Sequence, residues 1–499
     1  MSGNATARID RPSLSPAMIA IICASAVVGA TAVLYGRVIL IAFVSALLFV
    51  VFRWLICRRM RFWQGLMLIS LTGFIIFNYG FENLVLGRVA GIPVLIGHVL
   101  MFWGLSLAAF SCPRSTIRDF FAQPAVKCFA LLVAISMIHL AIEVPRSGLW
   151  ALRDASLFIE SVFLLAGFAW IREPGSLPLI KRWLVVLFVL NLLYSCTLPL
   201  GETLQDVSPK TGVFQPVPLL GNYQHNALYL VAGALFFIWF GPELGIRRWM
   251  AVCLSIAQLA ALAIMQTRSM YVGFVIVVLL LLVVGERRKL SSIAGLIPGT
   301  AIAVALLMFF VSSSGVQVRG RVFDLSSDSL EQYAGSIFAL TDRNSRLGQD
   351  EDRMDWLQQT WDGTTSTAAR TLFGQGFGEP LLKDVVNDNG MPVRQPHNST
   401  AGVFGRVGLN GIIPWLLFHV CMIGRFVSAQ RGRLHLSLEQ RDLMLWLFAF
   451  YVLALVLSMV QPAFEFSHCA IPVFFLLGMA LGIAPETSPA SDALLSFQE

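Results

Sequence analysis

Charged residues are scarce in this chain of 499 residues. Asp, Glu, Lys and Arg together make up 13% of the sequence, whereas hydrophobic residues make up 57%. The hydrophobic residues occur in long runs and exceed what one soluble core needs. This composition excludes an ordinary soluble domain and predicts a protein whose main solvent is the lipid bilayer.

Three further absences narrow the class. None of the eight cysteines lies in the long polar segment near residues 313–400, so no disulfide is predicted there, and all eight are assigned to helix packing. No internal repeat is apparent, whereas transporters usually contain symmetric repeats. No small-residue cleavage site follows the first apolar run, which is therefore predicted to be a retained helix and not a signal peptide.

Apolar runs long enough to cross a bilayer as helices, about 20 residues each, occur roughly fourteen times along the chain. The predicted fold is an all-α polytopic membrane protein with about 14 transmembrane helices (12 to 14). Residues 1–312 contain about eleven of them, residues 313–400 form one large, partly helical external loop, and residues 401–499 contain about three more and a tail. The predicted spans lie near residues 17–35, 38–56, 63–79, 92–110, 126–142, 155–171, 183–200, 226–240, 249–265, 270–284, 292–312, 401–424, 443–460 and 467–484.

The distribution of Lys and Arg predicts how these spans are oriented. One set of alternate loops carries most of the basic residues, and the other short loops carry only a few: Arg37, Arg88, Arg146, Arg153 and Lys210. Short positively charged loops are retained in the cytoplasm. Both termini are therefore predicted to be cytoplasmic, and the loop at 313–400 periplasmic. The net charge of +7 is then a topogenic signal and not a surface for nucleic acid.

The external loop is predicted to be folded and functional, because loops longer than about 15 residues are seldom simple connections. Met354, Leu357 and Trp361 recur at helical spacing, which predicts a short helix opened by Asp350–Asp352 and closed by Gly363. The loop contains more acidic than basic residues. Surface ion pairing is the interpretation for five of its arginines: Arg319, Arg321, Arg343, Arg346 and Arg370.

Two places combine arginine with unusual local sequence. Arg268, in Thr267-Arg268-Ser269, lies at the outer junction of two spans, where its guanidinium either reaches the lipid headgroups or binds phosphate through a planar, bidentate fork. Arg353 lies in the predicted loop helix, upstream of Gly374, Gly376 and Gly378. Glycines at alternate positions permit a tight turn or close approach of the backbone to a ligand.

A third place begins at Arg394 and continues through His397 and Asn398 at the mouth of the next span. Pro396 restricts the preceding residue to an extended conformation, which holds His397 near the start of the helix. An imidazole there either accepts a proton from a hydroxyl or acts only as a polar cap. The glycines that follow at every third position allow another helix or a lipid chain to approach closely: Gly402, Gly405, Gly408 and Gly411.

Two polar residues elsewhere have simpler interpretations. His225 is expected to cap a helix at the outer face or to form a pocket wall. Glu160 is an acid inside a predicted span, so it either has a function or pairs with an arginine for assembly.

In this order, the three places resemble the O-antigen ligase and polymerase family. Members share an arginine at an outer span end, a periplasmic loop with an Arg-x-x-x-Trp helix and a Gly-x-Gly-x-Gly turn, then His-Asn and a Gly-x-x-Gly element. The resemblance covers about residues 212–484, and the matching residues are Thr267-Arg268-Ser269, Arg353 to Trp356, Gly374 to Gly378, His397-Asn398 and Gly408 to Gly411. In Arg353 to Trp356 the arginine and the tryptophan are one residue closer than in the family pattern.

The resemblance implies a glycosyltransferase C-like enzyme of the bacterial inner membrane, with its active site at the periplasmic face. The reaction would be a metal-independent, inverting transfer from an undecaprenyl-pyrophosphate-linked oligosaccharide to a glycan or to lipid A-core, without a cofactor. Arg268 and Arg353 would bind the pyrophosphate, with Arg394 as a further candidate, and His397 would remove the acceptor proton. Membrane lipids and a chain-length regulator are the other implied partners; nucleic acid is not.

The chain departs from the family pattern at Arg406, where many members have an acid, and at Ala401 and Phe404, where leucines are common. The acceptor is therefore open. A polymerase of surface polysaccharide or exopolysaccharide is favoured because fourteen spans exceed the twelve common among ligases. The alternatives are an O-antigen ligase, a protein-directed oligosaccharyltransferase, a metal-dependent transferase that uses Asp350–Asp352, and a glycolipid flippase or transporter.

Overall fold

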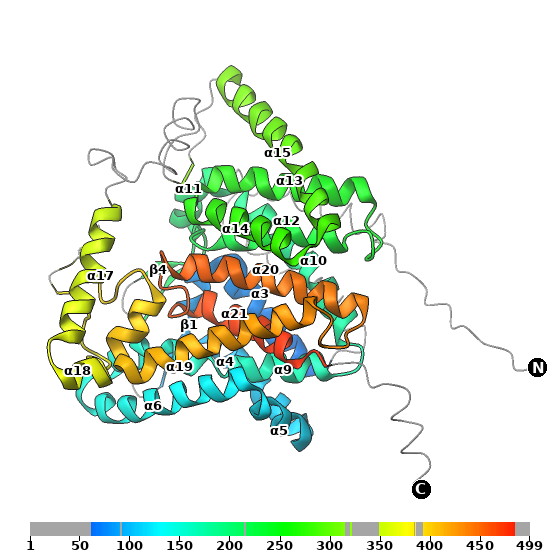
Figure 1. The fold of residues 1–499 in the computed structure, drawn as a ribbon. Helices are drawn as coiled ribbons and strands as arrows, with labels where there is room; N and C mark the ends of the chain where they lie inside the picture. The colour runs from blue at the N-terminus through cyan, green and yellow to red at the C-terminus, as the bar shows by residue number, and fades with distance from the viewer. Residues whose placement is uncertain are drawn as a thin grey trace, which may run out of the picture.

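The computed structural model describes residues 61–89, 92–213, 216–314, 320–321, 349–383, 385 and 393–484. The predicted spans near 17–35 and 38–56 lie outside these residues. In the part that is described, most helices run roughly side by side in one bundle, and α17 and α18 of the external loop lie across one end of it (Figure 1).

The first half of the described chain forms helices that are mostly apolar, interrupted by short polar turns. They are α3 (Phe62–Glu82), α4 (Ile96–Ser111), α5 (Arg114–Ala122), α6 (Pro124–Ser147), α7 (Leu149–Asp154), α8 (Ser156–Glu160), α9 (Phe163–Arg172), α10 (Ser176–Ser195), the 3-10 turn Leu198–Leu200 and α11 (Gly201–Val207).

The second half continues the bundle and includes the described part of the loop. Its helices are α12 (Asn226–Phe240), α13 (Arg248–Met265), α14 (Arg268–Val284), α15 (Arg287–Ser314), α17 (Gln349–Thr365), α18 (Ala368–Phe373), α19 (Ser399–Gln430), α20 (Leu438–Ser458) and α21 (Ser467–Gly482). α15 projects from the bundle (Figure 1), and only 11% of its apolar window is buried within the protein, as expected of a helix that faces lipid.

Seven described helices are long and apolar enough to cross a membrane, and the count is eight if α4 and α5 form one span bent by 110°. Three more apolar helices, α12, α14 and α21, are shorter. The chain is thus a multi-pass membrane protein. The structure supports this class but does not establish the predicted total of 12 to 14 spans.

The predicted span at 155–171 is wrong as a single helix. The segment breaks at Ser161 and Val162, between α8 and α9. The Ser161 hydroxyl donates to the Phe158 carbonyl, and Glu160 is buried beside His98 and Ser467. Average hydropathy over the segment did not reveal the break, because Glu160 and Ser161 lie between longer apolar stretches.

Two small sheets modify the all-α prediction. β1 (Val85–Val89) pairs antiparallel with β2 (Ile92–Leu95), and β3 (Lys210–Thr211) pairs with β4 (Val217–Pro218). Both follow helices at the same end of the bundle as the candidate site. They close short connections between helices and satisfy backbone groups there.

α21 occupies the centre of the bundle, and all of its residues are buried. It packs closely on α9 because Gly167 and Gly478 lack side chains. A Cβ at Gly167 would lie 1.8 Å from the Phe475 carbonyl oxygen, and one at Gly478 would lie 2.0 Å from that of Leu164. The start of α21, which carries His468, is therefore fixed firmly in the core.

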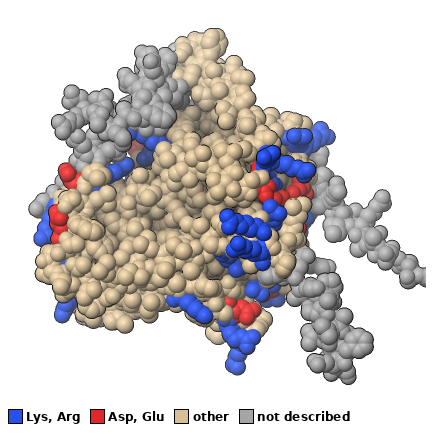
Figure 2. Space-filling view, viewed as in Figure 1, with Lys and Arg blue, Asp and Glu red and all other residues tan. Residues whose placement is uncertain are grey.

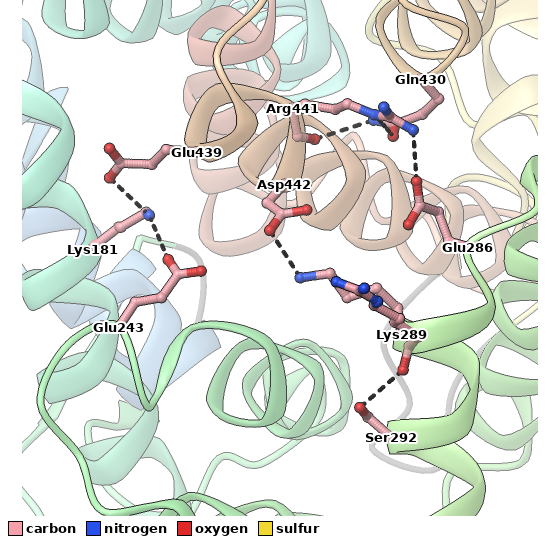
Figure 3. A network of polar contacts seen from close by, with 10 residues as sticks. Lys181, Glu243, Glu286, Lys289, Ser292, Gln430, Glu439, Arg441 and Asp442 are labelled. Atoms are coloured by element: carbon pink, nitrogen blue, oxygen red, sulfur yellow. Dashed lines mark hydrogen bonds and ion pairs between the residues drawn. The ribbon is translucent and has the colours of Figure 1, made fainter.

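The end of the bundle opposite α17 and α18 is held by ion pairs between helix ends (Figure 3). Buried Lys181 contacts Glu243 at 3.3 Å and Glu439 at 2.9 Å, and Lys289 contacts Asp442 at 3.0 Å. Arg441 contacts Glu286 at 2.8 Å. Larger groups of Lys and Arg gather at this end in Figure 2, in keeping with the basic loops used to predict orientation.

Candidate functional site

His397 lies just before α19, against the helix that carries Arg353. The rings of His397 and Trp356 meet edge-on, with centroids 4.8 Å apart and planes at 86°. Arg353 is one turn before Trp356 on α17. The structure thus brings together the loop helix and the histidine that precedes the span, two of the three places singled out by sequence.

The buried face of α17 differs from the predicted one. Met354 and Trp361 are exposed, whereas Thr360 and Thr364 are buried against α19. Both threonine hydroxyls donate to carbonyls one turn earlier, so their polarity is satisfied within the helix. The helix also continues past Gly363 to Thr365. The fully buried face of this helix is formed by threonines, while the partly exposed Trp361 packs on Phe404 of α19.

The surroundings of His397 oppose a positive charge on its ring. Burial, followed by the nearby charge of Arg353, lowers the pKa of His397 to about 4. The imidazole is therefore neutral at neutral pH and has a lone pair available for a proton. Asn398 caps α19 by accepting from the Ala401 amide at 2.9 Å, and its own amide donates to the Met459 carbonyl.

Arg268 is the first residue of α14, directly after a sharp reversal from α13. Gln266 adopts a left-handed conformation with φ of 47°, and buried Thr267 accepts a hydrogen bond from the Arg321 guanidinium at 3.2 Å. Arg321 was interpreted as a surface ion-pairing residue. One contact of its side chain is with the turn that precedes Arg268, and nothing in the local sequence of the loop signals this contact.

The glycine turn folds against α19. Gly374, Gly376 and Gly378 all have positive φ, at 77°, 81° and 93°. The Gln375 amide donates to the Gly405 carbonyl at 2.7 Å, and the Gly376 amide to the Arg406 carbonyl at 3.1 Å. The glycines are required both for these left-handed conformations and for close approach between two backbones.

A buried cluster of three charges holds this turn in place. Asp154 contacts Arg394 at 3.0 Å and Arg406 at 2.9 Å, and it accepts from the Gly378 amide at 3.1 Å. Arg394 also donates to the Gly378 carbonyl, and Arg406 to the Gly376 and Glu379 carbonyls. We call Asp154, Arg394 and Arg406 the arginine clamp. It links the end of α7, the loop and α19.

The clamp accounts for two features of the sequence. Arg406 replaces the acid common in the family, and its charge is balanced here by Asp154. Arg394, a candidate for pyrophosphate binding, also lies over the Trp150 ring at 4.4 Å. These contacts give Arg394 a role in positioning the turn; a role in pyrophosphate binding stays a prediction.

The glycine row of α19 allows close approach, as predicted, both by the loop helices α17 and α18, at Thr360 and Leu372, and by loop segments. A Cβ at Gly408 would lie 2.5 Å from the Gly374 amide nitrogen, and one at Gly405 would lie 2.7 Å from Leu381. Gly402 faces the carboxylate of Glu465. Gly408 has φ of 66° and kinks α19 where the glycine turn meets it.

A second histidine-rich cluster lies beside this site. His225 begins α12, as predicted, but its side chain makes no capping bond. Its Nδ1 lies 2.6 Å from Nε2 of His468, whose Nδ1 contacts the Glu82 carboxylate. Burial, together with the charges of His468, Arg321 and His397, holds the pKa of His225 well below its ordinary value. The predicted topology places Glu82, His225 and His468 at the outer ends of their helices. This shared position is a signal in the sequence that could have identified the cluster.

Glu160 is paired, but with His98 at 3.4 Å and with the Ser467 hydroxyl, not with an arginine. Among the residues that the structure describes, no group of three or more His, Cys, Asp or Glu could hold a metal ion. The side chains of Asp350–Asp352 lie outside that description.

The fold and these contacts define a multi-pass helical membrane protein with arginine and histidine side chains gathered at one end of the bundle. Residues 253–416 match the family model described as Wzy_C, O-antigen ligase. The segment includes Arg268, Arg353, the glycine turn and His397. The predicted resemblance is confirmed for this segment, which is similar to the O-antigen ligase domain that polymerases and ligases share. No significant match to a curated protein was found.

This segment is thus similar to a family of membrane proteins that includes O-antigen ligases and polymerases, which act in polysaccharide and lipopolysaccharide biosynthesis.

Proposed function

We propose that this protein is a polymerase of surface polysaccharide or exopolysaccharide, which transfers an undecaprenyl-pyrophosphate-linked glycan to a hydroxyl of another glycan. The observation that carries the proposal is the neutral imidazole of His397, in contact with Trp356 and under the charge of Arg353. A neutral imidazole beside a guanidinium suits a reaction that needs one base and a counter-charge for a phosphate leaving group.

In this mechanism His397 is the catalytic base. The acceptor hydroxyl attacks the anomeric carbon of the donor from the face opposite the pyrophosphate. The new carbon–oxygen bond forms as the bond to the phosphate oxygen breaks, which inverts the anomeric configuration. His397 takes the hydroxyl proton, and undecaprenyl pyrophosphate leaves with the negative charge.

Arg268 and Arg353 would bind the leaving pyrophosphate. A guanidinium presents parallel N–H donors that match two phosphate oxygens, so two arginines can balance the growing charge without a metal ion. Arg268 approaches from the junction of α13 and α14, and Arg353 from the loop helix α17. Arg321, bound to Thr267, adds positive potential beside Arg268.

The glycine turn and the arginine clamp would position α17 and His397 relative to each other. The turn is bonded to α19 through Gly405 and Arg406. Gln375, in the same turn, donates to Thr364 of α17 at 3.1 Å. The distance between the loop helix and the start of α19 therefore depends on the turn. Proximity of this kind supplies rate only when the groups are held rigidly.

An O-antigen ligase that uses lipid A-core as acceptor is the second candidate, because the matched domain is shared by both activities. We favour the polymerase because the sequence predicts more spans than most ligases have. The periplasmic location of the site and the cytoplasmic location of the termini belong to the same proposal and rest on the charge asymmetry of the loops.

The deciding experiment uses purified, full-length protein in liposomes with lipid-linked repeat units. The first reaction contains repeat units alone, and the second also contains lipid A-core. A polymerase gives a ladder of longer glycans in the first reaction. Transfer that occurs only when the core is present would replace this proposal with the ligase, and no transfer in either reaction would reject both.

A further inference from the structure

Glu82, His468 and His225 form a continuous chain of polar contacts at the end of the bundle that holds the candidate site. Glu82 ends α3, His468 lies at the start of α21, and His225 precedes α12. His468 is 0% exposed and His225 is 1% exposed. Two imidazoles and a carboxylate are costly to bury, and the transfer mechanism described above uses none of them.

The hydrogen-bond roles along the chain follow from Glu82. An ionised carboxylate only accepts, so Nδ1 of a neutral His468 carries the proton and its Nε2 is the acceptor. Nδ1 of His225 must then donate to that Nε2, 2.6 Å away. This leaves Nε2 of His225 as a lone pair. It is buried and makes no hydrogen bond to any residue that the structure describes.

Nε2 of His225 lies within reach of the charges of the candidate site. The positive charge of Arg321 and that of a protonated His397 both act on His225. Arg321 in turn donates to Thr267, next to Arg268. At its other end the chain of polar contacts stops at Glu82, on which the charge of His98 also acts. Glu160, bonded to His98, and the thiol of Cys469 are further titratable groups that interact with Glu82.

Ring contacts fix the orientation of both imidazoles. The ring of Phe466 stacks on His468 at 5.5 Å, and Tyr79 meets it edge-on at 6.4 Å. His225 and His468 have centroids 4.6 Å apart. The central position of α21 restrains His468 further. A chain of groups held this rigidly is suited to moving a proton between fixed atoms.

We propose that Glu82, His468 and His225 form a proton relay that receives, from His397, the proton released by the acceptor hydroxyl during glycan transfer. This inference rests on the proposed function. It makes His225 and His468 positioning and proton-transfer residues that act through His397, rather than additional catalytic bases in contact with the acceptor.

The proton moves in three balanced steps. His397 takes the proton from the acceptor hydroxyl and becomes an imidazolium. A bridging water would accept a proton from His397 while it donates one to Nε2 of His225, and His397 returns to the neutral form. His225 then releases its Nδ1 proton to Nε2 of His468, and the resulting imidazolium of His468 lies against the Glu82 carboxylate. After the last step His225 is neutral again, and the imidazolium of His468 and the carboxylate of Glu82 form an ion pair.

The relay would move a positive charge away from a buried site that disfavours it. The site around His397 disfavours an imidazolium there, so a proton left on His397 would oppose the reaction. A carboxylate beside His468 stabilises the same charge at a short distance from the site. The charge therefore ends next to Glu82 and not next to Arg353, whose guanidinium would repel it.

The test compares wild-type protein, Glu82→Gln and His225→Gln in liposomes, in single-turnover transfer from the lipid-linked donor. The rate is measured in mixtures of H₂O and D₂O, and donor binding is measured separately. Wild-type protein should show a curved dependence of rate on deuterium fraction, because more than one proton moves. Each variant should bind donor normally, transfer about 100-fold more slowly, and show a linear dependence.

His419→Gln is the matched control. It removes another buried imidazole, which contacts Tyr451 within the bundle and lies outside the relay. The control should keep the wild-type rate and the curved dependence. Glu82→Gln preserves the shape of the side chain, so it tests the relay even if His225→Gln folds poorly.

The outcomes distinguish a failure of the proposed function from a failure of the relay alone. If neither wild-type protein nor the control transfers glycan, the proposed function fails and the relay with it. If both transfer and a folded relay variant keeps the wild-type rate and a curved dependence, only the relay is rejected. A loss of protein yield with unchanged rate per folded molecule would also reject it, because that is the behaviour of a structural group.

Discussion

His397 contacts Trp356 and lies under the charge of Arg353, two residues of a helix in a different part of the sequence. The motif analysis identified His397 and Arg353 as candidates, and the structure places them beside each other. The relation between them is electrostatic as well as geometric, since the guanidinium helps to keep the imidazole neutral.

Replacing His397 with Ala should leave a folded protein that binds the lipid-linked donor but transfers glycan about 100- to 10,000-fold more slowly. A sugar hydroxyl is a weak nucleophile until a base removes its proton. Turnover and donor binding, measured on the same preparation, test this. His435→Ala is the control, because His435 is exposed beyond the far end of α19. Retained turnover in well-folded His397→Ala would exclude the base.

The pH dependence follows from the lowered pKa of His397. Its ring is neutral above about pH 4, so kcat/KM should stay level below neutral pH and decline only near about 4. Because the folded pKa lies below the ordinary value of 6.5, the stabilisation linked to this group is complete above about 6.5. It is lost as the pH falls towards 4.

Arg353→Gln should move the low-pH decline of kcat/KM, which we call the acid limb, to higher pH, because removing a positive charge makes protonation of His397 easier. Burial remains, so the limb should stop short of 6.5. Arg353→Lys is the control that keeps the charge and should leave the limb nearly in place, even if donor binding weakens. An acid limb that is identical in all three proteins would contradict the electrostatic link.

At the level of elements, the glycine turn, α17 and α19 behave as one unit. The backbone of the turn is bonded to Gly405 and Arg406, and the side chain of Gln375 reaches Thr364. The kink of α19 at Gly408 makes room for this contact. The arginine clamp then connects the unit to α7 and α8 through Asp154.

Asp154→Asn should destabilise this unit strongly, because it leaves Arg394 and Arg406 buried without a counter-charge. Breaking a buried ion pair typically costs about 3–5 kcal/mol. The free energy of unfolding in detergent and hydrogen exchange at residues 374–378 would measure the effect. Asp119→Asn is the control: its pair with Arg172 is exposed, at 3.8 Å, and should contribute under about 1 kcal/mol. Equal stability of the two variants would contradict the clamp.

At the level of the whole molecule, the two ends of the bundle differ in chemistry. One end joins helices through ion pairs such as Lys181 with Glu439, among basic loops. The other end holds the loop helices and the candidate site (Figure 1). This asymmetry is the structural counterpart of the charge pattern that predicts orientation.

A reporter fused after Asp388 should be active only in the periplasm, because residues 313–400 follow a span whose opposite flank is strongly basic. Fusions after Arg248 and after Arg433 serve as controls and should be active only in the cytoplasm. Cytoplasmic activity of the Asp388 fusion would reverse the topology and remove the periplasmic site.

Glycan transfer should survive chelation of divalent cations, because arginines are proposed to balance the pyrophosphate charge. The measurement is transfer rate with and without EDTA, in a buffer otherwise unchanged. Loss of transfer that magnesium or manganese ions restore would contradict this expectation and direct attention to Asp350–Asp352.

The sequence by itself determined the membrane class and the resemblance that the family model confirms over residues 253–416, whereas the external position of the loop and the roles of its motifs stay predictions. These depend on local hydropathy, charge and spacing, which a chain carries before it folds. Only the tertiary structure decided that Arg394 and Arg406 share Asp154, that α17 is buried through threonines, and that the helix break at Ser161 replaces one predicted span. It also decided that His225 meets His468, 243 residues away. The physical reason is that buried polar groups are paired across helices, and the partner of each is chosen by packing and not by neighbours in sequence.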